Sequence, residues 1–195
     1  MNVSGRDEFF AKNQRDLAAL YLADPSNPYQ QSGRSSGAAR WHETRSLIAD
    51  AVDRDGSFLD VGCANGLLLE TLAQWLTDRG LTIQPFGLDF IPELVDLARK
   101  RIPQGRFWVD NAWSWVPPQR FDYVRTNLEY VPAADRHDSV ERQRSWVASG
   151  GRLILCHYRD RGTDQVDVAE FLETHDYGVA GAAVADGVSV AWTDL

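Results

Sequence analysis

Two aspartates, each at the end of an apolar run, are the residues whose types and spacing could bind a small polar ligand. Asp60 closes one run and leads into a turn that contains Gly62 and Gly66. These glycines let the turn bend sharply and approach a ligand closely. The leucine-rich stretch after Gly66 predicts a helix whose free N–H groups and positive dipole end face the turn. Asp89 closes a second run, about 20 residues beyond the turn, where doubly wound sheets bind ribose hydroxyls. The pattern indicates a nucleotide-like ligand.

Two further apolar runs close on polar side chains, over residues 107–111 and 121–129. Downstream of the first run, predicted strands alternate with predicted helices over residues 67–78, 92–101, 137–148 and 165–174. Such alternation is typical of a parallel sheet with crossover helices, which binds ligands beyond the carboxyl ends of its strands. Two β-rich runs, 178–184 and 188–194, flank the hairpin signal Asp186-Gly187. We therefore expect a doubly wound α/β sheet that ends in an antiparallel hairpin.

The residues before the first strand predict a helical extension. Residues 7–23 and 38–52 have helical spacing, and Pro, Ser and Gly between them predict a loop over Pro25–Gly37. We expect one domain over residues 1–195, with a helical cap over 1–53 and a core over 54–195. At 195 residues the chain is long enough for one such domain with a sizeable core.

The composition of the chain argues against several classes of binding partner. The formal charge is −8 and lysine is scarce, which disfavours nucleic acid because such binding depends on clustered cations. No apolar stretch is long enough for a membrane helix, and the N-terminus lacks the features of a secretory or transit signal, so we expect a cytoplasmic protein, as a monomer or homodimer, without a membrane partner. Cys63 and Cys156 have no metal-ligand spacing, so no metal site is predicted.

Five motifs occur in order along the chain: DVGCANG from Asp60, GLDF from Gly87, VDNA from Val109, FDYVRTNLEYVP from Phe121 and SGGRLILCHY from Ser149. Together they resemble the class I S-adenosylmethionine-dependent methyltransferases, a family with a seven-stranded, mostly parallel sheet. The first motif departs at Ala64, where the family often has glycine; alanine is strained there if φ is positive. A nicotinamide-binding domain is the main competitor, but it requires G-x-G-x-x-G after the first strand.

The resemblance implies roles for individual residues. Asp60 would orient the methionine end of S-adenosylmethionine, although a strand-end aspartate can also simply cap the next helix. Asp89 would bind the ribose, and Asp110, otherwise a turn residue, the adenine amino group. Separately, the composition of the loop Pro25–Gly37 predicts that it is mobile without a ligand and orders over the cofactor, where Arg34 or Arg40 could pair with the methionine carboxylate. The predicted cofactor site comprises Asp60, Gly62, Cys63, Ala64, Asn65, Gly66, Asp89, Phe90, Ile91, Asp110, Asn111, Ala112, Asn127, Leu128, Tyr130 and Arg40.

No residue pattern identifies a catalytic base. His157 and Glu129 are weak candidates, and methyl transfer to a good nucleophile depends mainly on alignment. The resemblance implies methyl transfer to an oxygen or nitrogen of a small molecule. The chain lacks the N-P-P-Y or D-P-P-Y signature of enzymes that methylate nucleobase amino groups. The alternatives are a non-catalytic S-adenosylmethionine-binding sensor or partner protein and, disfavoured by the charge, an RNA methyltransferase.

Overall fold

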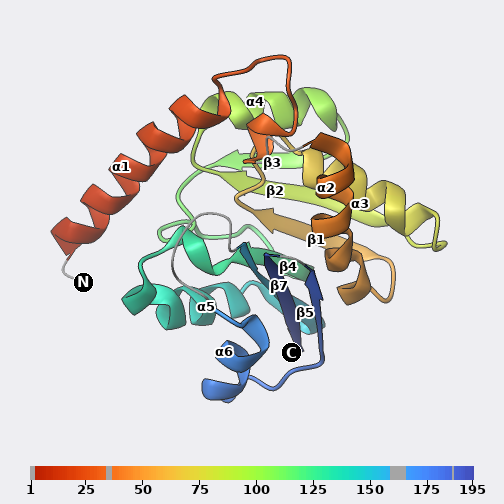
Figure 1. The fold of residues 1–195 in the computed structure, drawn as a ribbon. Coiled ribbons are helices and arrows are strands. Elements are labelled where there is room, and N and C mark those ends of the chain that lie inside the picture. The colour runs from red at the N-terminus through yellow and green to blue at the C-terminus, as the bar shows by residue number, and fades with distance from the viewer. Residues whose placement is uncertain (1–2, 34–36, 159–165, 186) are drawn as a thin grey trace.

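The fold is built on a seven-stranded sheet with the strand order β3-β2-β1-β4-β5-β7-β6 (Figure 1). The computed structural model describes residues 3–33, 37–158, 166–185 and 187–195. The first five strands pair in parallel, and β7 is antiparallel to both β5 and β6. This confirms the predicted fold class. The strands are β1 (Gly56–Val61), β2 (Ile83–Asp89), β3 (Arg106–Val109), β4 (Phe121–Asn127), β5 (Val147–Tyr158), β6 (Gly181–Ala185) and β7 (Val188–Asp194).

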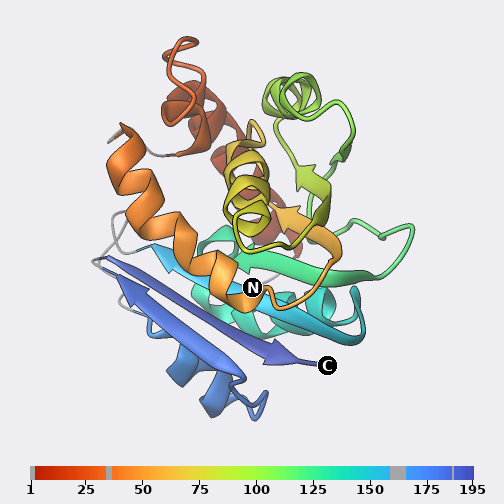
Figure 2. The same ribbon diagram turned by 90° about the vertical axis from the view of Figure 1, so that its right-hand side faces the viewer.

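Helices cover both faces of the sheet, so alternate side chains of its central strands enter different cores (Figure 2). Phe58 of β1 packs with α3 (Leu67–Thr77) and α4 (Pro92–Arg101), whereas Leu59 packs in the core beneath α5 (Arg136–Arg144) and α6 (Val168–Thr174). Burial on both faces explains the nearly continuous apolar runs of these strands. Parallel pairing brings the carboxyl ends of β1, β2, β4 and β5 to one edge of the sheet.

Several predicted elements differ in extent from the observed ones, including α1, which spans Val3–Tyr21 instead of 7–23, and β6, which spans Gly181–Ala185 instead of 178–184. The helix expected over 137–148 ends at Arg144, because Trp146 and Val147 are buried and Val147 already pairs with Phe121 in the sheet. The helix expected over 38–52 divides into α2 (Gly37–Arg45) and the 3-10 helix η2 (Ser46–Ala51). The last helix begins at Val168, where Asp167 accepts the N–H groups of Ala169 and Glu170. Residue 165 lies outside the described residues.

The first helix, α1 (Val3–Tyr21), crosses the edge of the sheet at which the parallel strands end (Figure 1). Arg6 forms an ion pair with Asp135, beyond β4, at 3.0 Å. Gln14 donates a hydrogen bond to the carbonyl of Phe90, beyond β2. The helix is therefore held on both sides of the same edge.

Part of the predicted loop Pro25–Gly37 is packed against the glycine turn. It contains the 3-10 helix η1 (Gln30–Ser32), and Gln31 is buried. Asn65 donates to the Gln31 side chain at 3.1 Å and to the Pro28 carbonyl at 3.0 Å. Residues 34–36 lie outside the described residues, as does Asp186 of the predicted hairpin turn. Gly187 of that turn has φ of 72°. None of the helices in the described ranges combines the length and apolar character that a bilayer span requires.

Candidate active site

The turn between β1 and α3 places its two glycines in different environments. Both have positive φ, 74° at Gly62 and 77° at Gly66. A Cβ at Gly62 would lie 2.4 Å from the Tyr130 ring, whereas a Cβ at Gly66 would lie 3.1 Å from Ala98 of α4. Ala64, which stands where the family often has glycine, has a φ of 47°. Its backbone is therefore in the left-handed region, which is strained for alanine. Gly62 therefore faces the site, and Gly66 permits close packing between helices.

Asp60 ends up beneath this turn as a buried carboxylate with one oxygen paired and the other available. Its Oδ1 accepts a hydrogen bond from Arg125 at 3.0 Å, and both side chains are almost fully buried. Its Oδ2 is buried and has no hydrogen-bond partner among the described residues. Burial raises the pKa of Asp60, while Arg125 acts in the opposite direction. The free oxygen can accept a hydrogen bond from a ligand donor.

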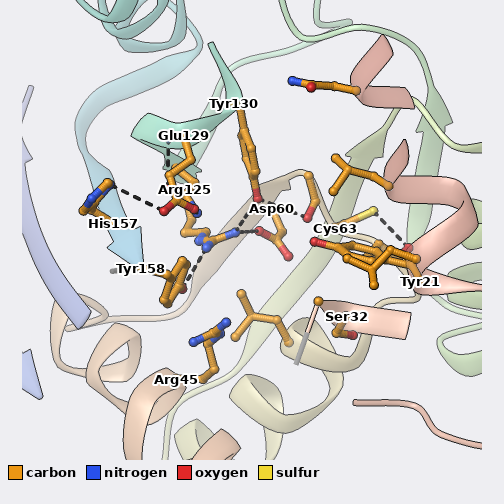
Figure 3. Close-up of a pocket in the computed structure, with 18 of the residues that line it drawn as sticks. Tyr21, Ser32, Arg45, Asp60, Cys63, Arg125, Glu129, Tyr130, His157 and Tyr158 are labelled. Atoms are coloured by element: carbon orange, nitrogen blue, oxygen red, sulfur yellow. Dashed lines mark hydrogen bonds and ion pairs between the residues drawn. The ribbon is translucent and has the colours of Figure 1, made fainter. Parts of the chain in front are cut away.

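Arg125 is the main residue of the site that the sequence analysis missed. It lies on β4 with only 3% of its surface exposed, and its guanidinium donates to Asp60 and, at 2.9 Å, to the hydroxyl of Tyr158 (Figure 3). Tyr130 lies 3.4 Å from the same guanidinium. A cation inside the apolar run of a central strand was the available signal, because such a residue must be paired when it is buried.

Asp89 is held by the backbone at the end of β2. The Ala64 N–H donates to its Oδ2 and the Ile91 N–H to its Oδ1, each at 2.9 Å. Burial raises the pKa of Asp89 to about 6, against the lowering effect of these bonds. Each carboxylate oxygen keeps a second lone pair, so the oriented group can still accept bonds from a ligand.

Two adjoining cavities lie along the edge of the sheet, and Gly62 and Tyr130 line both. The smaller, of about 110 Å³, lies beyond β2. The larger, of about 880 Å³, lies beyond β1, β4 and β5. From α1, Leu17 and Tyr21 contribute to both. The smaller cavity is lined by the predicted residues Asp89, Phe90, Ile91, Asp110, Asn111 and Ala112. The larger is lined by the predicted residues Arg40, Asp60, Cys63, Ala64, Asn127, Glu129 and His157.

Three predicted cofactor residues line neither cavity. The Leu128 side chain is buried in the core under α5 and α6. Asn65 is fully buried and bonds to the segment before α2, and Gly66 packs on α4. Arg34, the other residue proposed for the methionine carboxylate, lies outside the described residues. Asn65 and Gly66 therefore hold the turn against the surrounding protein and do not face a cavity.

The two weak catalytic candidates come together. His157, at the end of β5, is 2% exposed, and its Nδ1 lies 3.8 Å from Oε1 of Glu129 in the 3-10 helix η3 (Leu128–Tyr130) (Figure 3). The Asn127 side-chain oxygen accepts the Glu129 N–H at 3.2 Å. The pair therefore lies in the wall of the larger cavity, and Glu129 also lines the smaller one.

Arginine is concentrated in the same wall, although the chain as a whole is acidic. Arg40 pairs with Glu43, and Arg136 donates to the carbonyl of Leu128. Arg45, at the end of α2, lies over the Tyr158 ring with 3.6 Å between the guanidinium carbon and the ring centroid. The sequence analysis missed Arg45, because nothing in its local pattern distinguishes it from a surface arginine.

A comparison with known proteins defines the class to which this fold and site belong. Residues 58–151 match the family model of a methyltransferase domain. The fold superposes on the N-methyltransferase NodS of Bradyrhizobium japonicum, crystallised with S-adenosyl-L-homocysteine, with a TM-score of 0.68, 14% identity and coverage of 93% of this chain and 97% of that one. It superposes on magnesium protoporphyrin IX methyltransferase of Synechocystis with bound S-adenosylmethionine, with a TM-score of 0.63, 17% identity and coverage of 100% and 99%.

The family model and the methyltransferase neighbours support a class I S-adenosylmethionine-dependent methyltransferase. Among curated relatives, a trans-aconitate 2-methyltransferase of Sinorhizobium medicae is 34% identical over 117 residues, which are 60% of this chain and 44% of that protein. An uncharacterized protein from a Streptomyces fradiae transposon is 31% identical over 57% of this chain and 33% of that protein. The chain thus spans less than half the length of these curated relatives.

Proposed function

We propose that this chain binds S-adenosylmethionine across the two cavities and transfers its methyl group to an oxygen or nitrogen of a small molecule. The observation that supports the proposal is the spatial order of three residues, Asp89, Gly62 and Asp60, along the edge of the sheet at which the parallel strands end. An oriented carboxylate, a close-approach glycine and a carboxylate with a free oxygen match a ribose, a thioether-like centre and an ammonium group in turn.

The residues present fit this cofactor. Both oxygens of Asp89 can accept ribose hydroxyls, and Asp110 in the same cavity can accept the adenine amino group. The orphaned Oδ2 of Asp60 can accept the ammonium group of the methionine end. Arg40 lines the same cavity and is the described arginine proposed for the methionine carboxylate. Gly62 lines both cavities, and its missing Cβ leaves room for the Tyr130 ring beside them.

When bound, S-adenosylmethionine supplies a sulfonium methyl group that forms a bond to an acceptor lone pair, while the electron pair of the S–CH3 bond stays on sulfur and S-adenosylhomocysteine is the product. The chain's own residues would orient the cofactor and the acceptor and enclose them in the cavities. Arg125 and Tyr130 hold the wall beside Gly62, and α1 covers the cavities. The pair His157 and Glu129 can take the proton of an acceptor that has one to lose. Alignment supplies most of the effect when the acceptor is already an anion.

We also propose that residues 1–53 form the cap of the site. Three segments of this extension line the larger cavity: α1, η1 and α2. The contacts of Arg6 with Asp135 and of Gln14 with Phe90 hold α1 across it. A cofactor or acceptor enclosed by these segments is shielded from water.

Calorimetry tests the proposed function. S-adenosylhomocysteine and S-adenosylmethionine are each titrated into the protein, with NAD as the matched nucleotide control. We expect heat with the first two and none with NAD; the reverse result contradicts the proposal. A second arm measures S-adenosylhomocysteine formed from S-adenosylmethionine in the presence of metabolite extracts. Binding without any product in all extracts would favour the non-catalytic sensor or partner protein.

A further inference from the structure

Arg45 is a buried cation that forms no ion pair among the described residues, although the buried Asp60 is close enough to interact with it electrostatically. Only 6% of its surface is exposed, and it lines the larger cavity. Its guanidinium donates one hydrogen bond, from Nη1 to the hydroxyl of Thr44 at 3.1 Å, and forms no ion pair among the described residues. The rings of Tyr158 and Trp41 lie at 3.6 and 5.2 Å from its guanidinium carbon. Figure 3 shows the guanidinium beneath Tyr158 and directed toward the cavity.

Two of the arginines of this wall have printed carboxylate partners: Arg40 pairs with Glu43, and Arg125 pairs with Asp60. Asp60 is the buried carboxylate nearest to Arg45 and Arg125, and its Oδ1 is taken by Arg125. A buried guanidinium is expensive without an anion, and a cation–π contact recovers only part of that energy. A planar fork of N–H donors that faces a cavity is suited to the two oxygens of a carboxylate. The site is thus complete only when an anion occupies it.

The position of Arg45 separates it from the cofactor residues. Asp89 and Asp60 follow β2 and β1, whereas Arg45 lies on Tyr158, the last residue of β5. In the sheet order β2-β1-β4-β5, this places Arg45 on the side of His157 and Glu129. Arg40, one helical turn earlier on α2, is already proposed for the methionine carboxylate.

We propose that Arg45 binds a carboxylate of the methyl acceptor, so that the acceptor of this enzyme is a small carboxylic acid. The inference rests on the proposed function and names the substrate class of the same site. The carboxylate lies against the Tyr158 ring and is held by the guanidinium edge that faces the cavity. It gives the Arg45 guanidinium an ion pair.

The test uses calorimetry on the full chain saturated with S-adenosylhomocysteine. The probes are trans-aconitate, citrate and succinate, with succinamide as the neutral match. We expect at least one acid to bind and succinamide not to bind. Arg45→Gln should weaken the binding of that acid by about tenfold or more, the effect of losing a charge-assisted hydrogen bond. Arg45→Lys, which keeps the positive charge, should weaken the binding of that acid less than Arg45→Gln does. Arg79→Gln removes an exposed arginine remote from the cavity and should change nothing.

Titrations of the unloaded protein separate the two carboxylates that Arg45 could bind. S-adenosylhomocysteine carries the methionine carboxylate, and 5′-methylthioadenosine lacks it. Unchanged affinity of Arg45→Gln for both supports the acceptor assignment. Weaker binding of S-adenosylhomocysteine alone assigns Arg45 to the cofactor and overturns the inference.

Three other results also overturn it: no acid binds the loaded wild-type chain, acid and amide bind equally, or Arg45→Gln binds the acid as tightly as wild type. Should Arg45→Gln fail to fold by circular dichroism, the comparison of acid with amide on wild type and Arg45→Lys still decides. Failure of wild type to bind S-adenosylhomocysteine contradicts the proposed function instead, and so the two failures are distinguishable.

Discussion

The two halves of the site are built in different ways. Beyond β2, a carboxylate is fixed by two backbone N–H groups within a small cavity, and its neighbours Phe90 and Ile91 follow it directly in the chain. Beyond β4 and β5, the cavity is larger, and its acidic residues and arginines come from α1, α2, β1, β4, η3 and α5. The first half depends on local backbone geometry and the second on pairing between distant side chains. A cofactor that never varies suits the first arrangement, and an acceptor that differs between enzymes suits the second.

Arg125→Leu is the strongest test of this contrast. It leaves the Asp60 carboxylate buried without its cation, and breaking a buried pair in this way costs about 3–5 kcal/mol in the free energy of unfolding. Urea unfolding measures the loss, and the double variant with Asp60→Asn should recover part of it. Arg79→Gln, which breaks an exposed pair, is the control. A loss of less than about 1 kcal/mol would show that Arg125 is there for ligands and not for the scaffold.

Asp89→Ala tests the other half. The folded variant should bind S-adenosylhomocysteine about 1.5–3 kcal/mol more weakly, the range for hydrogen bonds to a charged group. Calorimetry gives the affinity, and circular dichroism shows whether the backbone still folds without the bonds from Ala64 and Ile91. Asp78→Ala, at an exposed aspartate that lines neither cavity, is the matched control. Equal affinity of wild type and a folded Asp89→Ala would make Asp89 a structural residue of the turn.

The same division explains what could be predicted from the sequence. Short segments of sequence were enough to predict the turn after Asp60, the position of the Asp89 carboxylate and the limits of α4. In these segments hydrophobic periodicity, glycines and a proline determine the structure locally. The contacts of Arg125 with Tyr158 and of Arg45 with the same ring join residues far apart in the chain, and no local pattern encodes them. The end of α5 was misplaced for a related reason, since Val147 is taken into the sheet by Phe121. Sequence therefore predicts the half of the site beyond β2 better than the half beyond β4 and β5.

Asp89 should also make cofactor binding depend on pH. Burial raises its pKa to about 6 from the usual value of 3.8, so protonation competes with the ribose hydroxyls below pH 6. Affinity for S-adenosylhomocysteine should be constant above that value and fall by up to about tenfold per pH unit below it. For the free protein the sign is opposite: this group contributes stability that is fully present below pH 3.8 and lost as the pH rises through about 6.

Asp89→Asn removes this titration and is the control for it. Calorimetry from pH 5 to 8 should give a flatter affinity profile for the variant than for wild type. Asp60, whose pKa is also raised by burial, acts in the same direction and leaves some residual dependence. Identical profiles for wild type and variant would mean that the proton is taken up elsewhere in the site.

The smallest expected effects concern the pair in the larger cavity. His157→Ala and Glu129→Gln should each lower kcat by less than the roughly 100-fold that removal of a true general base produces. The physical reason is that a carboxylate acceptor is already an anion and has no proton to lose, so alignment by Arg45 and the cavity walls does most of the work. The measurement is product formation with the acid identified in the binding experiment, at saturating S-adenosylmethionine. A larger loss in either variant, with affinity for S-adenosylhomocysteine intact, would identify His157 or Glu129 as the base and point to an acceptor that must be deprotonated.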